Sequence, residues 1–136
     1  MRSRYLLYYG AAAATAIAGI LHLVMAPNML NFNPNGAILF FVGGAAQLFW
    51  AVPMARRWGR AWYAVGIAGT AVLVALWVIT RMPGNPVTGR GGPVNEMGLA
   101  VELLQAAFMG LTAAVLAMES RAMMRADRAA AQDAGA

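Results

Sequence analysis

The chain has 136 residues, of which 61% are hydrophobic and 11% are charged, whereas about a quarter of the residues in a soluble domain carry a charge. It contains no cysteine, which excludes disulfides, thiolate-bound metal sites and cysteine-bound iron–sulfur clusters. Its single histidine argues against most metallohydrolase chemistry. This composition indicates a membrane protein.

Four apolar stretches are long enough to cross the hydrocarbon core of a membrane, which takes about 20 residues in a helix. None of them has the alternating pattern of a barrel strand, so they predict transmembrane helices. In chain order the predicted spans are residues 5–25, 37–54, 62–80 and 97–118. The sequence therefore predicts an all-α integral membrane protein, with a four-transmembrane-helix bundle over residues 1–118.

The ends of the predicted helices carry their own signals. Pro27 is expected to end the first helix, and Asn95 is expected to cap the start of the fourth. Residues 82–94 contain too many glycines and prolines for a helix and predict an irregular loop. Residues 119–136 are expected to continue the fourth helix as a cytoplasmic tail that frays near its end. The first span exceeds the about 7–15 apolar residues of a signal peptide, so we expect it to be retained.

Arginines are distributed unevenly between the two sides of the predicted bundle. Only Arg81 and Arg90 belong to one side. Because short cytoplasmic loops retain basic residues, we expect the other side, which holds both termini, to be cytoplasmic. The protein is then a multi-pass protein of the cytoplasmic (inner) membrane whose outer loops are residues 26–36 and 81–96. The arginines on the cytoplasmic side are Arg2, Arg4, Arg56, Arg57, Arg60, Arg121, Arg125 and Arg128.

Several polar side chains are expected in the half of the bundle next to the outer loops. A helical rise of about 1.5 Å per residue places His22, Glu102 and Gln105 about 5, 9 and 13 Å below that surface, and Gln47 about 15 Å below it. An ionisable group at the centre of a span costs about 2.5–3.5 kcal/mol, so such groups usually face a partner or water. We therefore predict a polar cluster in which Arg81 pairs with a glutamate and His22 donates a hydrogen bond to a carboxylate or to Gln47. The predicted cluster consists of His22, Gln47, Arg81, Glu96, Glu102 and Gln105.

Small residues accompany this cluster on the first two spans. Gly19 shares a helical face with His22, and Gly43 and Gly44 lie about one turn from Gln47. Because small residues let transmembrane helices approach closely, this pattern predicts tight packing of the first span on a neighbour.

Methionine provides a second interpretation of the outer boundary. Ten residues are methionine, and several of them lie near His22. Thioether and imidazole groups together suit Cu(I), so His22, Met25 and Met29 are tentative copper ligands. The paired histidines of b-type haem are missing, and haem is not expected. A third interpretation is a quinone-linked or proton-coupled protein that uses Glu102 as its buried carboxylate.

Four segments together resemble a loosely defined group of small four-span membrane proteins of bacteria and archaea, and more distantly DoxX-like membrane proteins. They are GILHLVMAP (residues 19–27), FFVGGAAQLFWAVP (residues 40–53), WVITRMPGNPVTG (residues 77–89) and NEMGLAVELLQ (residues 95–105). The resemblance implies a four-helix fold and either a quinone-linked redox role or an accessory-subunit role. It supplies no catalytic residue for this chain.

The small size and short outer loops leave little room for an independent active site, and no catalytic residue is predicted. We therefore expect a non-enzymatic accessory or stabilising subunit of a larger membrane assembly. Its expected partners are the lipid bilayer and either other membrane protein subunits or further copies of the chain. The net charge of +5 fits attraction to anionic lipid headgroups. The lack of lysine and of a basic patch with interleaved aromatic residues argues against nucleic acid.

Overall fold

The computed structural model describes residues 2–135, and within them the chain forms four α-helices and no strand. The helices are α1 (Arg2–Met29), α2 (Pro34–Arg56), α3 (Arg60–Ile79) and α4 (Glu96–Ala134). All four are long and apolar enough to cross a membrane. The prediction of an all-α fold with four such helices is confirmed.

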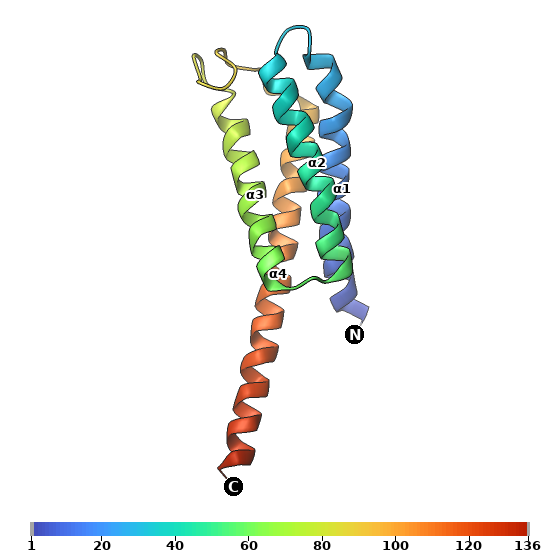
Figure 1. The fold of residues 1–136 in the computed structure, drawn as a ribbon, viewed down its shortest axis with the longest axis vertical. Coiled ribbons are helices and arrows are strands. Elements are labelled where there is room, and N and C mark those ends of the chain that lie inside the picture. The colour runs from blue at the N-terminus through green and yellow to red at the C-terminus, as the bar shows by residue number, and fades with distance from the viewer. Residues whose placement is uncertain (1, 136) are drawn as a thin grey trace.

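The four helices run up and down side by side, as Figure 1 shows. Helix α1 packs closely against α2 and α4, whereas α3 packs mainly against α4 and contacts α2 less. The turn after α1 and the long connection between α3 and α4 lie at one end of the bundle, which we call the loop end (Figure 1). The opposite end, which we call the termini end, carries the start of α1 and the projecting part of α4 (Figure 1).

Two asparagines fix the helix starts at the loop end. The Asn33 side chain accepts a hydrogen bond from the Gly36 amide at 3.0 Å and caps α2, whose first residue is Pro34. The Asn95 side chain accepts one from the Gly98 amide at 2.7 Å and caps α4, which confirms the predicted cap. Both caps satisfy amides that have no partner within the helix.

Pro27 does not end the first helix, and the prediction that it would do so is wrong. Helix α1 continues to Met29, so Pro27 lies in its last turn. The fixed φ of proline suits a helix, and the proline removes only one intrahelical hydrogen bond at that position. The helix ends instead where the Phe32 and Asn33 amides both donate to the Met29 carbonyl.

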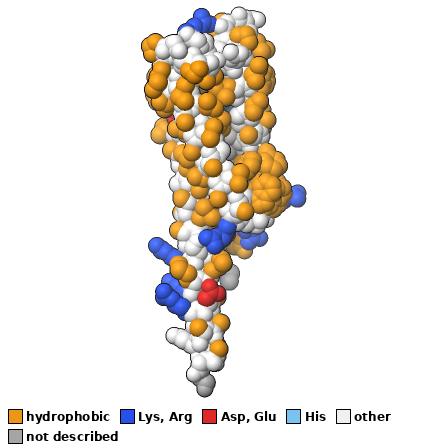
Figure 2. Space-filling model, turned by 60° about the vertical axis from the view of Figure 1, so that its left-hand side comes forward, with side chains coloured by type: hydrophobic (Ala, Val, Ile, Leu, Met, Phe, Trp, Pro, Cys, Tyr) orange, Lys and Arg blue, Asp and Glu red, His pale blue; other side chains and the backbone are white. Residues whose placement is uncertain are grey.

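The half of the bundle near the termini end has an apolar core, in which Met54, Tyr63 and Phe108 are fully buried. The full set of buried residues in this core is Tyr8, Ala11, Ala12, Ala14, Met54, Tyr63, Phe108 and Val115. Hydrophobic side chains also cover much of the outside of the bundle, and Figure 2 shows basic side chains gathered near its two ends. This distribution is the one expected of helices that cross an apolar layer.

Helices α1 and α2 cross with their backbones close together at two glycines. A Cβ atom on Gly19 would lie 2.8 Å from the Gly44 carbonyl oxygen, and one on Gly44 would lie 2.8 Å from the Gly19 carbonyl oxygen. Neither position has room for a larger residue. The close approach that the small residues predicted is confirmed here.

Hydrogen bonds join the helices at the termini end, where α4 begins to project. The Tyr8 hydroxyl donates to Glu119 Oε1 at 2.5 Å, and Arg60 Nη2 donates to Ser120 Oγ at 2.9 Å. Beyond these contacts the residues of α4 are exposed. With 39 residues, α4 is about 58 Å long at the usual helical rise, which exceeds the about 40–45 Å of a whole bilayer. Part of α4 therefore extends beyond any membrane that the other helices span.

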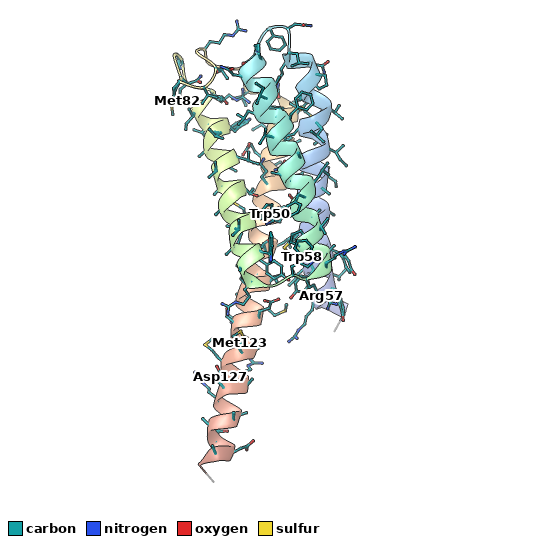
Figure 3. The ribbon with its side chains drawn as sticks, viewed as in Figure 1. Trp50, Arg57, Trp58, Met82, Met123 and Asp127 are labelled. Carbon is teal, nitrogen blue, oxygen red and sulfur yellow. The ribbon has the colours of Figure 1, made fainter. Side chains whose placement is uncertain are left out.

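Aromatic side chains gather around the turn between α2 and α3, also at the termini end. The rings of Trp58 and Trp62 lie 5.1 Å apart between centroids, as do those of Phe49 and Trp50. The Trp50 indole donates a hydrogen bond to the Trp62 carbonyl at 2.9 Å. Figure 3 shows Trp50 and Trp58 at this level, with Arg57 close by. Partly exposed tryptophans beside arginine are typical of a membrane–water boundary.

Candidate functional site

A cavity of about 570 Å³ lies at the loop end. Its walls come from the end of α1, the start of α2, the start of α4 and the connection between α3 and α4. It is lined by Met25, Asn28, Met29, Phe32, Asn33, Gly36, Leu39, Phe40, Thr80, Arg81, Thr88, Arg90, Gly91, Gly92, Pro93, Asn95 and Gly98. The lining contains two arginines and no acidic side chain.

The irregular connection that forms one wall is organised by Asn85, which is 5% exposed. Its Oδ1 accepts hydrogen bonds from the Val87 amide at 3.1 Å and from the Thr88 amide at 2.8 Å. Its Nδ2 donates to the Met82 and Arg90 carbonyls, both at 3.0 Å. Residues 82–94 form no helix, as predicted, but one buried amide gives them a defined shape.

Two contacts join this connection to the turn after α1. Arg90 Nη2 donates a hydrogen bond to the Phe32 carbonyl, and Asn35 Nδ2 donates one to the Val87 carbonyl at 3.0 Å. Segments that lie more than 50 residues apart in the chain are therefore joined beside the cavity. Sequence reasoning missed Asn85, although its bonds to residues a few positions away are typical of asparagine in turns. It missed the bridging role of Arg90 because no local pattern reveals which distant carbonyl a loop side chain will meet.

Arg81 lies in the wall of the cavity, directly above Trp77. Its guanidinium carbon is 4.8 Å from the centroid of the Trp77 ring, within the range of a cation–π contact. Its Nε is buried and has no hydrogen-bond partner. Burial lowers the pKa of the Arg81 guanidinium, and the charge of Glu102 acts in the opposite direction. Within the described part of the chain Arg81 forms no salt bridge with Glu96 or Glu102, so the predicted ion pair is not formed.

His22 is buried between α1 and α2. Its Nδ1 lies 3.1 Å from the Ala18 carbonyl oxygen, and its ring meets the Phe40 ring edge-on with 4.8 Å between centroids. The Gln47 side chain lies beside the ring, within reach of a hydrogen bond to it, but neither its oxygen nor its nitrogen makes a hydrogen bond of good geometry. The structure thus brings His22 beside Gln47, which was one of the two kinds of partner predicted for the ring, and among the described residues no carboxylate bonds to His22.

The other members of the predicted cluster are dispersed. Glu102 is half-buried on α4 at a level where its charge reaches Arg81, whereas Glu96 is exposed. Gln105 is 1% exposed, and its amide has no hydrogen-bond partner. Among residues 2–135, no three His, Cys, Asp or Glu side chains lie together as metal ligands would. Met25 and Met29 line the cavity, and His22 is absent from its lining, so the tentative copper site stays a prediction.

A second hollow, a groove of about 320 Å³, lies between α2 and α3, the pair of neighbouring helices that contact each other least. Most residues of its lining are apolar, and the polar ones are Thr15, Gln47 and Thr70. The lining residues are Thr15, Val42, Gly43, Ala46, Gln47, Trp50, Val65, Gly66, Ala68, Gly69, Thr70, Val72 and Leu73. A Cβ atom added to Gly69 would meet nothing within 4 Å, so the groove is open there.

Over its described residues the chain is all-helical, with four helices long and apolar enough to cross a membrane. No protein-family model, curated protein or solved structure matches the chain. The resemblance to DoxX-like proteins accordingly stays a prediction, and the function has to be argued from the chain itself.

Proposed function

We propose that the chain is a non-enzymatic accessory subunit of a larger assembly in the cytoplasmic membrane, and that a transmembrane helix of a partner protein occupies the groove between α2 and α3. The observation that carries this proposal is Gln47, whose side chain lines the groove, is 3% exposed and makes no hydrogen bond of good geometry.

The shape of the groove supports a helix as its occupant. Gly43 and Ala46 on α2 and Gly66 and Gly69 on α3 line the groove. The Trp50 ring packs against Gly66, whereas the groove is open at Gly69, where a Cβ atom would meet nothing within 4 Å. Transmembrane helices associate where small residues let their backbones come close, because packing and not water expulsion drives association in lipid. A groove lined in this way accepts the ridge of another helix.

The chemistry of Gln47 supports a polar group on that helix. A buried polar group without a hydrogen bond costs about 1–3 kcal/mol. Lipid chains offer neither donor nor acceptor, whereas a serine, threonine, asparagine or glutamine on a partner helix offers both. The occupant that relieves the cost is therefore a helix with such a side chain at the depth of Gln47.

The charges at the two ends of the bundle support the proposed orientation. Apart from Arg81 and Arg90 at the loop end, the arginines lie near the termini end or on the projecting part of α4. By the distribution of basic residues in membrane proteins, the termini end faces the cytoplasm and the loop end faces outward.

Replacing Gln47 with methionine is expected to stabilise the isolated protein in detergent while weakening the assembly. The apolar side chain removes an unpaired amide, and we expect a gain of about 1 kcal/mol in the free energy of unfolding. Gln105→Met is the matched control, because Gln105 is also a buried unpaired amide but does not line the groove. Both variants should raise the thermal midpoint, measured by circular dichroism.

Photo-crosslinking in cells tests whether Gln47→Met and Gln105→Met differ in their contact with a partner helix. A photoreactive residue in place of Ala68, which lines the groove, is expected to give one adduct of discrete mass. The same residue in place of Leu103, which is 72% exposed, is the control for random collisions. We expect Gln47→Met to remove the Ala68 adduct and Gln105→Met to keep it. Equal adducts from both positions would contradict the proposal, and an adduct of the chain with itself would identify a homo-oligomer.

One observation favours a soft-metal protein as a second candidate. The position of His22 Nδ1 near the Ala18 carbonyl leaves Nε2 as the nitrogen for a ligand, as is usual for histidines that bind metals. Met25 and Met29 would supply the thioethers. Stoichiometric copper in the purified protein, lost in His22→Ala, would favour this candidate over the accessory role.

A further inference from the structure

We infer that the loop-end cavity binds the phosphate headgroup of an anionic phospholipid, with Arg81 as the residue that contacts the phosphate. This inference goes beyond the accessory role, and it rests on the proposed membrane embedding but not on a partner helix in the groove between α2 and α3. The cavity lies at the loop end and the groove lies farther along α2 and α3, and no residue lines both. Each proposal can therefore fail without the other.

The charges around the cavity select an anion. Arg81 and Arg90 are the charged residues of its lining, and no aspartate or glutamate joins them. Arg90 already uses one nitrogen to bridge the cavity to the Phe32 carbonyl. Arg81 forms no salt bridge, and the nearest carboxylate whose charge affects it, that of Glu102, does not line the cavity. A partly buried positive charge in a cavity whose lining contains no carboxylate favours an anionic ligand.

The position of Arg81 is fixed before any ligand arrives. Trp77 supports one face of the guanidinium at 4.8 Å. Nη1 lies against Gly92, where a Cβ atom would come within 2.4 Å of it, so a larger residue at this position would push the guanidinium aside. Guanidinium groups bind phosphate oxygens through parallel hydrogen bonds, and a fork held in place loses less entropy when it does so. Arg81 is thus prepared to bind an oxyanion.

The remaining lining selects a lipid over a free anion. Apolar side chains predominate on the side of α1 and α2, where Asn28 and Asn33 are the polar residues of the lining. The apolar residues are Met25, Met29, Phe32, Leu39 and Phe40. The cavity lies where four spanning helices end or begin, which is the level of the headgroups in a bilayer. A molecule that presents phosphate at this level and apolar chains next to it is a phospholipid. Anionic headgroups add attraction to the unpaired arginine.

Native mass spectrometry of the purified full chain in detergent tests the inference. Phosphatidylglycerol is titrated in one arm, phosphatidylcholine in a second, and inorganic phosphate is added as a competitor in a third. The apparent dissociation constant is measured for the unmodified chain, Arg81→Gln, Arg81→Lys and Arg128→Gln. Arg128 is the matched control, because it lies on the exposed projecting part of α4 and lines none of the cavities described above.

We expect phosphatidylglycerol to bind more tightly than phosphatidylcholine and inorganic phosphate not to displace it. Arg81→Gln should weaken phosphatidylglycerol binding by about tenfold or more, as the loss of a charge-assisted hydrogen bond implies. The dissociation constant of Arg81→Lys should lie between those of the unmodified chain and Arg81→Gln, because lysine keeps the charge but loses the parallel hydrogen bonds of the guanidinium. Arg128→Gln should change the constant by less than about threefold, as expected of an exposed charge.

Three results would overturn the inference. Equal affinity for the two lipids would remove the role of the anionic headgroup, and equal losses in Arg81→Gln and Arg128→Gln would reduce the effect to net charge. Displacement by inorganic phosphate at the concentration at which phosphatidylglycerol binds would assign the cavity to a free anion. If Arg81→Gln does not fold, as judged by circular dichroism, the comparison between Arg81→Lys and the unmodified chain decides.

Discussion

Replacing Gly44 with alanine is expected to destabilise the bundle by about 1–3 kcal/mol, which is the usual cost of overpacking. The new Cβ would lie 2.8 Å from the Gly19 carbonyl oxygen and 3.0 Å from the His22 Cβ. Both atoms belong to parts of α1 that cannot move without separating the helices. Helices α1 and α2 form the most extensive interface of the structure, so the loss affects the whole fold. Thermal and denaturant unfolding in detergent, followed by circular dichroism, measure it.

Gly110→Ala is the control for this prediction. Gly110 lies within α4, and a Cβ atom there would meet nothing within 4 Å. Alanine favours the helix over glycine by about 0.8–1.0 kcal/mol, so this variant should be at least as stable as the unmodified chain. If Gly44→Ala proved as stable as Gly110→Ala, the close crossing of α1 and α2 would not exist in solution.

Replacing Phe108 with alanine is expected to destabilise the bundle by about 2 kcal/mol or more. Phe108 is fully buried in the apolar core near the termini end, together with Tyr63 and Met54. In soluble cores this change costs about 3–5 kcal/mol, part of which is the transfer of the side chain from water. In lipid or detergent the transfer part becomes small, because the unfolded chain also has apolar surroundings. The cost of the cavity remains, and it should dominate the change in the unfolding midpoint.

Leu103→Ala is the matched truncation on the outside of the same helix. Leu103 is 72% exposed, so its removal leaves no internal cavity, and the variant should unfold close to the unmodified chain. Equal losses of stability in Phe108→Ala and Leu103→Ala would show that α4 does not present the face that contains Phe108 to the core.

The four helices could be predicted from the sequence because length and hydropathy depend on each segment alone. The cap at Asn95 was predictable for the same reason, since its side chain bonds an amide three residues away. Pro27 was misread because the φ of proline is compatible with a helix, and the loss of one hydrogen bond did not prevent the next two residues from staying helical.

For the polar cluster, the sequence could predict only how deep each residue lies in the bundle. Residue positions along a span give the distance from the membrane surface, but they do not say which helices are neighbours. The structure places His22 and Gln47 between α1 and α2, and it places Arg81 near Glu102 on the other side of the bundle. Residues at similar depths, which were predicted to form one cluster, therefore lie in separate places because their helices are not all neighbours.

The loop-end cavity could not be predicted from the sequence at all. Its walls depend on the hydrogen bonds from Arg90 to the Phe32 carbonyl and from Asn35 to the Val87 carbonyl, which join segments more than 50 residues apart in the chain. A glycine- and proline-rich segment gives no periodicity from which such contacts could be read. Only the three-dimensional structure shows that this segment forms one wall of a cavity that is lined by two arginines and no carboxylate.

The proposed embedding and orientation of the chain in the membrane are directly measurable, because the chain contains no cysteine. Single cysteines replace Val94, which is 58% exposed in the connection before α4, and Ala130, which is exposed on the projecting part of α4. A membrane-impermeant maleimide is then applied to spheroplasts before and after permeabilisation. We predict that Val94→Cys is labelled in intact spheroplasts and that Ala130→Cys is labelled only after permeabilisation. Labelling in the reverse order, or recovery of the protein in the soluble fraction without detergent, would contradict the account.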